Sequence, residues 1–265
     1  MGILNVTPDS FSDGGKFTTI QDAVDAAILM FLHGADIVDI GGESTRPGAS
    51  PVSAEEQLER VLPVIAALKS EKRFPATGMI SIDTRSARVA EQAIAVGADM
   101  VNDVTAGTGD PDMFALVAKT GVPVVLMHMQ GSPETMQMNP HYHDVVAEVG
   151  DYLHQRIESA HVAGISDENI IVDPGIGFGK RREHNLSLLA NLEKIVSLGY
   201  PVLLGCSRKR FMGAICQEHQ PSELLGATVA TTVLGIMQGV RLFRVHDVKA
   251  NRQAADVAMA IAACR

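Results

Sequence analysis

The stretch Ile170-Ile-Val-Asp-Pro-Gly-Ile-Gly-Phe-Gly-Lys180 begins with a short apolar run, ends that run in an aspartate and continues into a glycine-rich loop. Seven other apolar runs of the chain also end in a polar or charged side chain. Together the eight runs cover residues 2–5, 36–39, 80–83, 100–102, 124–128, 170–173, 202–207 and 242–246. Such runs are typical of parallel strands buried on both faces. Because each is followed by enough sequence for a helix and two loops, they predict a (β/α)8 barrel, the TIM-barrel fold.

The length and composition fit one barrel. The chain has 265 residues, and barrels of this type run to about 250 residues. No linker, charge block or shift in composition divides it, so we expect a single domain over residues 1–265. A hydrophobic content of 46% is ample for a large core. No apolar run reaches the roughly 18 residues that a membrane span needs, and no secretory signal opens the chain.

Charge and cysteine content argue against several kinds of site. The net charge of −9 disfavours nucleic acid as a partner, because phosphate binding requires a basic face. Cys206, Cys216 and Cys264 are few, odd in number and without metal-ligand spacing. They indicate a reducing, cytoplasmic compartment rather than a disulfide scaffold. A zinc site is not expected, since His141 and His143 have no cysteine or third ligand nearby in the sequence.

Helical periodicity and glycine stops predict the helices between the strands. We expect helices at residues 20–33, 86–96, 110–120, 143–162, 222–238 and 250–263. Four of them are followed by a glycine where a left-handed C′ residue belongs, namely Gly34, Gly97, Gly121 and Gly164. Ser53 and Glu56 have the spacing of a capping box that opens a further helix.

The polar residues that end the strands predict an active site around one rim. In barrels of this kind the catalytic groups lie at the carboxyl ends of the strands. The residues at these positions are Asn5, Asp39, Asp83, Asn102, His128, Asp173, Ser207, Arg244 and His246. The alternative is that polar residues simply mark where any strand meets its loop.

The glycine-rich loop after residue 173 resembles a phosphate loop but does not match one. The glycines of Gly175-x-Gly-x-Gly-Lys180 lack the spacing of the dinucleotide fingerprint, and Arg181 stands where a P-loop needs Ser or Thr. We interpret these glycines as letting the backbone pass close to a flat ligand above Asp173. Phe178 then lies at the edge of that ligand, or alternatively only plugs a packing gap.

Two basic segments predict an anion site, and three polar residues predict its partner. Ser207-Arg-Lys-Arg-Phe211 is expected to open a helix after the seventh strand, and Arg244 and His246 end the neighbouring one. Helix N-termini and cationic side chains bind anions. Asp83, Asn102 and Asp173 favour a ligand rich in N–H groups, such as the guanidine-like edge of a pterin or guanine. The alternatives are solvated basic turns and a structural network of buried acids satisfied by backbone or Lys209.

Four segments together resemble the dihydropteroate synthase family. They are Asn5-Val-Thr-Pro-Asp-Ser-Phe-Ser-Asp-Gly14, Asp39-Ile-Gly-Gly-Glu-Ser-Thr-Arg-Pro-Gly48, Asp173-Pro-Gly-Ile-Gly-Phe178 and Ser207-Arg-Lys209. They follow that family's order, and the resemblance covers essentially the whole chain. It implies a (β/α)8 transferase that joins 6-hydroxymethyl-7,8-dihydropterin diphosphate to p-aminobenzoate. The expected products are 7,8-dihydropteroate and pyrophosphate, in folate biosynthesis, by a dissociative displacement.

The same resemblance implies roles for individual residues. The pterin is expected to contact Asp83, Asn102, Asp173 and Lys209, with Met127 and Gly177 also in the substrate site. The p-aminobenzoate is expected beside Thr45, Arg46, Pro47, Phe178, Ser207 and Lys209, with Asp9 and Phe11 arriving on the first loop. Pyrophosphate is expected at Asn5, Arg244 and His246, with Mg²⁺ at Asn5. The residues expected to act in catalysis are Asp9, Arg46, Lys209, Arg244 and His246.

The family also implies sulfonamide inhibition and a homodimer formed through the late helices. The chain departs from the family's pattern at two places. The family carries residues before the position that Met1 matches, so a segment under the barrel floor is expected to be absent. Arg210 stands where some members have Ser, which affects how a carboxylate of p-aminobenzoate is bound. A cobalamin-dependent methyltransferase and a non-catalytic pterin-binding relative remain as alternatives, and activity with p-aminobenzoate distinguishes all three.

Overall fold

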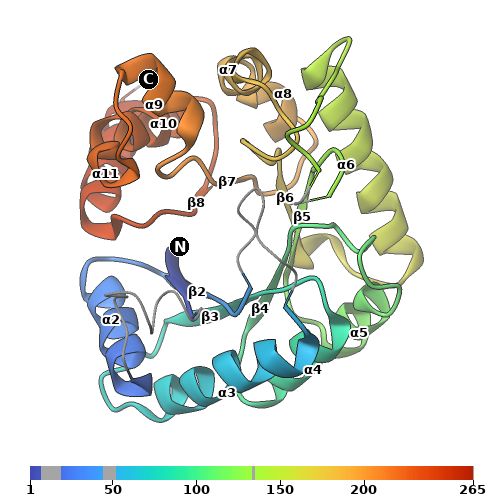
Figure 1. Cartoon of the computed structure of the whole chain (residues 1–265), viewed down its shortest axis with the longest axis vertical. Helices are drawn as coiled ribbons and strands as arrows, with labels where there is room; N and C mark the ends of the chain where they lie inside the picture. The colour runs from blue at the N-terminus through green and yellow to red at the C-terminus, as the bar shows by residue number, and fades with distance from the viewer. Residues whose placement is uncertain (7–18, 44–51, 133–134, 265) are drawn as a thin grey trace.

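The computed structural model describes residues 1–6, 19–43, 52–132 and 135–264, in which helices form a ring around a central set of strands (Figure 1). The strands are β1 (Gly2–Asn5), β2 (Ile37–Gly41), β3 (Met79–Asp83), β4 (Met100–Asp103), β5 (Val124–Met127), β6 (Ile170–Asp173), β7 (Leu203–Leu204) and β8 (Leu242–Phe243). The helices are α2 (Ile20–Leu32), α3 (Ala54–Ser70), α4 (Ala87–Ala95), α5 (Met113–Thr120), α6 (Val145–Val162), α7 (Arg182–Ala190), α8 (Leu192–Val196), α9 (Arg210–Cys216), α10 (Leu225–Met237) and α11 (Val248–Ala262). Two short 3-10 turns, η1 (Asp167–Asn169) and η2 (Pro221–Glu223), precede β6 and α10.

The strands close into the predicted barrel. Strands β1 to β6 pair in chain order, all parallel, and β7 pairs with β8. Bridges between Val172 and Val202 and between Gly2 and Val245 join the two sets. The Ile3 amide donates to the Val245 carbonyl at 3.1 Å, so the first and last strand segments share hydrogen bonds. Strands β7 and β8 are shorter than the sequence predicts, with two residues each, and beside them Val202 and Val245 make only isolated bridges.

Side chains alternate between two cores along each strand. Outward residues such as Val38, Ile80 and Leu126 pack beneath the helices in the larger core. Inward residues at the start of the strands form a second apolar cluster inside the barrel, made of Ile37, Met100, Val125, Ile171 and Leu203, with Met1, Met79 and Leu242 against it. This cluster, which we call the barrel floor, fills the lower interior. The strands themselves therefore supply the apolar packing at the barrel floor.

The helix ends confirm most of the sequence-based expectations. Gly34, Gly97, Gly121 and Gly164 all have positive φ after the helices they end. The capping box at Ser53 is only half formed, because Ser53 Oγ accepts from the Glu56 amide while the Glu56 carboxylate pairs with Arg60. No helix in the described ranges is both long and apolar enough to cross a membrane.

Helix α5 begins at Met113, three residues later than the sequence predicts. The reason lies in the Asp110 carboxylate, whose Oδ2 accepts from the Ala87 amide at 2.8 Å and whose Oδ1 accepts from the Asp112 amide at 3.1 Å. Asp110 therefore caps the start of α4 rather than extending α5, a long-range contact that local periodicity does not encode.

Candidate active site at the carboxyl rim

Inward residues at the ends of the first four strands form one row. Asn5, Gly41, Asp83 and Asn102 are successive Cα partners across β1, β2, β3 and β4. Gly41 keeps this row open, since a Cβ placed there would lie 3.6 Å from Asp83 Oδ2 and 3.8 Å from Asn5 Oδ1. Asp83 and Asn102 are buried. The predicted Asn5, Asp83 and Asn102 are thus brought together.

Arg244, which follows β8, joins this row through the buried Asp39. Its Nε donates to Asp39 Oδ2 at 2.6 Å, and its Nη2 donates to Asp83 Oδ2 at 2.7 Å. Asn102 Nδ2 donates to the same Asp39 oxygen at 3.1 Å. The structural network proposed as an alternative therefore exists, but Arg244 rather than Lys209 satisfies it.

Burial and charge set opposite pKa shifts in this network. The pKa of Asp83 is raised to about 7, chiefly by burial. Arg244 opposes this shift, and the Asp39 carboxylate adds to it. Burial alone would lower the pKa of Arg244, but the Asp39 and Asp83 carboxylates outweigh it and raise that pKa. Asp39 Oδ1 is buried and has no hydrogen-bond partner among the described residues. The strand-end pattern placed Asp39 on the predicted rim, but the family resemblance gave it no role.

A second group forms around Asp173 at the end of β6. Asp173 Oδ1 accepts from the Gly175 amide at 2.7 Å, and a Cβ on Gly205 would lie 3.8 Å from Asp173 Oδ2. Burial raises the pKa of Asp173 to about 6, although the Gly175 amide and Lys209 oppose the shift. Met127 is its Cα partner on β5 and is also buried. The Asp173 carboxylate therefore lies close to Gly205, which has no side chain.

Lys209 and Phe178 form the opposite side of the same group. The Lys209 ammonium lies 4.3 Å from the centre of the Phe178 ring, a cation–π contact. Gly177 leaves room for this contact, because a Cβ there would lie 3.1 Å from Lys209 Cδ. Burial lowers the pKa of Lys209 to about 8. The expected neighbours Gly177, Phe178 and Lys209 are therefore adjacent.

The predicted anion site is only partly assembled. Ser207 Oγ lies 2.9 Å from His246 Nδ1 and accepts from the His246 amide at 3.1 Å, so these two residues meet. Arg208 instead makes a bidentate pair with Asp247, and Arg210 is exposed. Of the three cationic residues after β7, only Lys209 reaches the group around Asp173. The basic cluster expected from sequence is therefore divided among three environments.

Some predicted residues lie outside the described ranges, and the predicted rim residue His128 contacts the buried Lys180 instead. Asp9, Phe11, Thr45, Arg46 and Pro47 fall within residues 7–18 and 44–51, which are not described. His128 ends β5 as expected, but its Nδ1 lies 2.8 Å from the buried Lys180 ammonium instead of facing the rim. Burial lowers the pKa of His128 to about 3, so its ring is a neutral acceptor.

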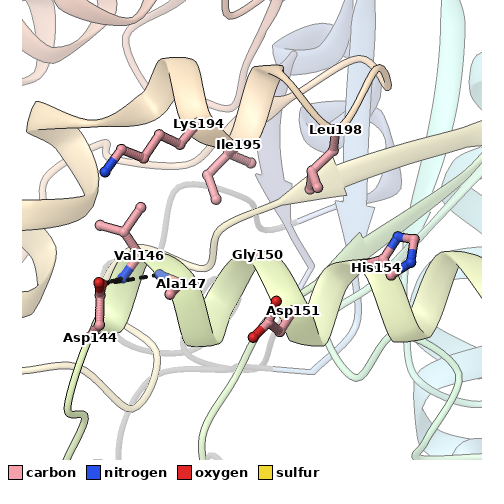
Figure 2. Close-up of a pocket in the computed structure, with 9 residues that line it drawn as sticks. All are labelled: Asp144, Val146, Ala147, Gly150, Asp151, His154, Lys194, Ile195 and Leu198. Atoms are coloured by element: carbon pink, nitrogen blue, oxygen red, sulfur yellow. Dashed lines mark hydrogen bonds between the residues drawn. The ribbon is translucent and has the colours of Figure 1, made fainter.

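The described residues outside the rim form no competing centre. These ranges contain no group of three or more His, Cys, Asp or Glu side chains arranged to hold a metal ion. A pocket between α6 and α8 is lined by Asp144, Asp151, His154, Lys194 and apolar neighbours (Figure 2). It lies among the outer helices and contains none of the residues predicted for the site.

Comparison with known proteins agrees with this geometry. A family model described as pterin binding enzyme matches residues 1–246. An Escherichia coli K12 protein named dihydropteroate synthase is 48% identical over 257 residues, covering 97% of this chain and 89% of that protein. A Yersinia pestis dihydropteroate synthase solved with a sulfonamide drug superposes with a TM-score of 0.93 at 42% identity, covering 99% of this chain and 94% of that one. A Xanthomonas albilineans dihydropteroate synthase solved with 4-aminobenzoic acid gives 0.90 at 46% identity, with 98% and 92% covered.

Proposed function

The chain belongs to the pterin-binding enzyme family and, within it, to the dihydropteroate synthases, and we propose how its described residues carry out that reaction. The activity is the transfer of a pterin-methyl group to p-aminobenzoate, a step of folate biosynthesis. The observation that carries our assignment of roles is the inward set Asp83, Asn102 and Asp173, buried at the carboxyl rim of the barrel. Catalytic groups of barrel enzymes lie at this rim.

We assign the pterin to the groups around Asp173 and Asp83. The amino-pyrimidinone edge of a pterin presents N–H groups in the same fork as a guanidinium, and carboxylates accept such a fork well. The contact of Asp83 with the Arg244 guanidinium supports this chemistry, since the carboxylate already accepts from a planar donor. As a carboxylate, Asp173 only accepts hydrogen bonds, and its Oδ1 accepts from the Gly175 amide. Its second oxygen is the acceptor that we assign to the pterin edge.

The p-aminobenzoate position follows from Lys209, Phe178 and Ser207. Phe178 offers a ring face and edge for the aromatic amine, and the Lys209 ammonium lies over that ring. A sulfonamide has the same aniline end, so we expect it to compete with p-aminobenzoate at these residues. The Yersinia pestis relative was solved with such a drug, which supports the expectation. The contributions of Phe11, Thr45, Arg46 and Pro47 remain predictions from sequence.

The leaving pyrophosphate is assigned to Asn5, Ser207, Arg244 and His246. The Arg244 contacts to Asp39 and Asp83 use Nε and Nη2, whereas a guanidinium has further N–H groups to offer. Ser207 and His246 are held together at the neighbouring strand end. These donors would neutralise the charge that develops as the bond to pyrophosphate breaks.

Asn5 fits the Mg²⁺ that the family implies. One side-chain amide oxygen beside a carboxylate at the rim suits a cation that keeps waters and takes its other oxygens from a substrate phosphate. When bound, the ion would supply positive charge to the departing pyrophosphate. Asn5 would hold it, with Asp83 as the nearest carboxylate in the strand-end row.

The reaction needs no strong base from the protein. An aromatic amine is neutral near pH 7 and attacks with its own lone pair. The pterin ring can delocalise positive charge after pyrophosphate departs, which favours a dissociative displacement. The residues then have three tasks, which are to orient the pterin through Asp173, to place the amine beside Phe178 and to hold pyrophosphate at Ser207 and His246.

Pyrophosphate release tests this proposal. The protein is mixed with 6-hydroxymethyl-7,8-dihydropterin diphosphate and Mg²⁺, with and without p-aminobenzoate, and both pyrophosphate and 7,8-dihydropteroate are measured. We expect equal amounts of the two products when the amine is present. Pterin binding without any product would instead indicate a non-catalytic pterin-binding protein.

We also propose a homodimer formed through α10 and α11, in a cytoplasmic compartment. Several apolar residues of these helices are exposed, including Val233, Leu234, Val257, Met259 and Ile261. Such a surface supports association with a second copy. The free thiols of Cys206, Cys216 and Cys264 support a reducing compartment. Light scattering should give the mass of a dimer, and a Val257→Glu, Ile261→Glu variant should give that of a monomer.

A further inference from the structure

The loop that connects β6 to α7 is held from the inside by Lys180. This lysine is only 3% exposed. Its ammonium lies 2.8 Å from His128 Nδ1, 2.9 Å from the Gly175 carbonyl and 3.0 Å from the Phe178 carbonyl. It also lies 3.4 Å from the His128 carbonyl. All of these partners are neutral acceptors of the protein itself. Lys180, the lysine of the phosphate-like Gly-x-Gly-x-Gly-Lys sequence, is therefore directed at the protein rather than at a ligand.

Two of these contacts lead directly to the substrate site. The Gly175 carbonyl accepts from the Lys180 ammonium, and the Gly175 amide donates to Asp173 Oδ1 at 2.7 Å. The Phe178 carbonyl also accepts from the Lys180 ammonium, and the centre of the Phe178 ring lies 4.3 Å from the Lys209 ammonium. One buried ammonium thus contacts the carbonyls of two residues of the loop: Gly175, whose amide holds Asp173, assigned to the pterin, and Phe178, assigned to p-aminobenzoate.

The loop has little freedom to compensate if this ammonium is removed. Gly175 has a φ of 65°, and a Cβ there would lie 1.8 Å from the His128 carbonyl, so the loop and the end of β5 are in direct contact. Asn185 Oδ1 accepts from the Gly177 amide at 2.7 Å, and the Tyr142 hydroxyl donates to the Gly179 carbonyl at 2.7 Å. The Asn185 and Tyr142 side chains thus hydrogen-bond other backbone groups of the loop than the Gly175 and Phe178 carbonyls that Lys180 contacts. Removing it would leave buried acceptors unsatisfied, which displaces the loop or admits water.

We propose that Lys180 is a positioning residue for both substrates, because it holds the loop backbone at Gly175, whose amide contacts Asp173, and at Phe178, whose ring lies beside Lys209. The inference rests on the proposed function for the roles of Asp173 and Phe178. Lys180 touches neither substrate. The pyrophosphate is assigned to Ser207 and His246, which hydrogen-bond each other at the ends of β7 and β8, so its binding serves as the reference for a local effect of Lys180.

The test compares Lys180→Met with wild type and with Lys72→Met, a control at an exposed lysine on the α3–β3 connection. Calorimetry gives the dissociation constants of 6-hydroxymethyl-7,8-dihydropterin and of pyrophosphate with Mg²⁺, and steady-state assays give KM for p-aminobenzoate. We expect the pterin dissociation constant and the p-aminobenzoate KM to rise about tenfold in Lys180→Met. The pyrophosphate constant should stay within about twofold, as should all three values in Lys72→Met.

His128→Phe provides a second variant that is less disruptive. It keeps a ring beside Tyr152, whose centre lies 4.9 Å from that of His128, but it removes the Nδ1 acceptor. The same two constants should rise by about two- to threefold, with pyrophosphate binding unchanged. Unchanged pterin and p-aminobenzoate constants in both variants would overturn the proposal. A parallel loss of all three ligands would also overturn it, since that indicates a general structural role. If wild type itself formed no product, the proposed function rather than this inference would be wrong.

Discussion

The two ends of the barrel interior are built from the same strands, yet they hold opposite kinds of side chain. The barrel floor is apolar, whereas the rim holds acids, amides and an arginine. On four strands the side chain changes from apolar to polar between two inward positions that are two residues apart. The pairs are Ile37 and Asp39 on β2, Met100 and Asn102 on β4, Ile171 and Asp173 on β6, and Leu242 and Arg244 at β8. A distance of two residues along a strand is about 7 Å.

This short distance separates stability from chemistry. At the floor, removing apolar surface from water stabilises the fold and asks nothing of any ligand. At the rim, burial raises the pKa of Asp83 and Asp173, which means that their carboxylate forms are destabilised by the fold. A substitution at the floor should therefore reduce stability with little effect on the folded enzyme's activity, and one at the rim should do the reverse unless it leaves a charge without its partner.

Arg244→Leu should give the largest effect and is the one expected to affect both properties. It removes the guanidinium that pairs with the fully buried Asp39 and with Asp83, and breaking such a pair costs about 3–5 kcal/mol of unfolding free energy. It also removes a donor for pyrophosphate, so kcat should fall about 100-fold or more. Denaturant unfolding and steady-state kinetics measure the two. Arg244→Leu combined with Asp39→Asn should recover part of the stability, and strictly additive losses would contradict the pairing.

Ile171→Ala tests the floor alone. Ile171 is buried in the floor cluster, and truncating such a residue costs about 2–5 kcal/mol. Urea unfolding should report that loss, while kcat/KM per folded molecule at low temperature should stay within about twofold of wild type. A loss of kcat/KM as large as that of a rim variant would show that the two ends are not independent.

Asp173→Asn tests the rim alone. The amide keeps an acceptor for the Gly175 amide but loses the charge offered to the pterin, a contact of about 1.5–3 kcal/mol. Pterin affinity should therefore fall roughly tenfold to 150-fold. Calorimetry measures this, with pyrophosphate binding as the internal control. Unchanged pterin binding would remove β6 from the pterin site.

The pH dependence of stability gives the smallest effect. The folded-state pKa of Asp173 is about 6, above its ordinary value of 3.8, so between these values the folded protein holds more protons than the unfolded chain. Its contribution to stability is therefore complete below pH 3.8 and is lost as the pH rises through about 6. Relative to wild type, Asp173→Asn should gain on the order of 1–3 kcal/mol between pH 4 and pH 8. A difference between the two proteins that does not change with pH would argue against a buried carboxylate here.

The sequence predicts most of the fold because the signals are local. Apolar runs, their polar ends and the glycines that stop helices all act within a few residues, and they place eight strands and most helices correctly. The errors fall where a side chain pairs with another group than the one its local spacing favours. Asp110 caps α4 from outside α5, and Glu56 pairs with Arg60 instead of closing its capping box.

The site is less predictable for the same reason. Strand ends identify Asp83, Asn102 and Asp173 as rim residues, but they cannot show that Arg244 reaches Asp39, a residue 205 positions away in the chain. That contact exists only because the barrel closes. Likewise, the sequence places Lys180 in a phosphate-like loop, whereas the fold turns its ammonium inward to His128. Side-chain direction within a loop depends on what packs beneath it.

The most direct test of the division between floor and rim uses two positions on one strand. Ile171→Ala and Asp173→Asn are compared for the free energy of unfolding and for kcat/KM with the pterin diphosphate, both at pH 8. The division predicts crossed results, with Ile171→Ala losing about 2–5 kcal/mol of stability and little activity. Asp173→Asn should lose at least about tenfold in kcat/KM and no stability. If both variants lost stability and activity in the same proportion, the two ends of β6 would not have separate roles.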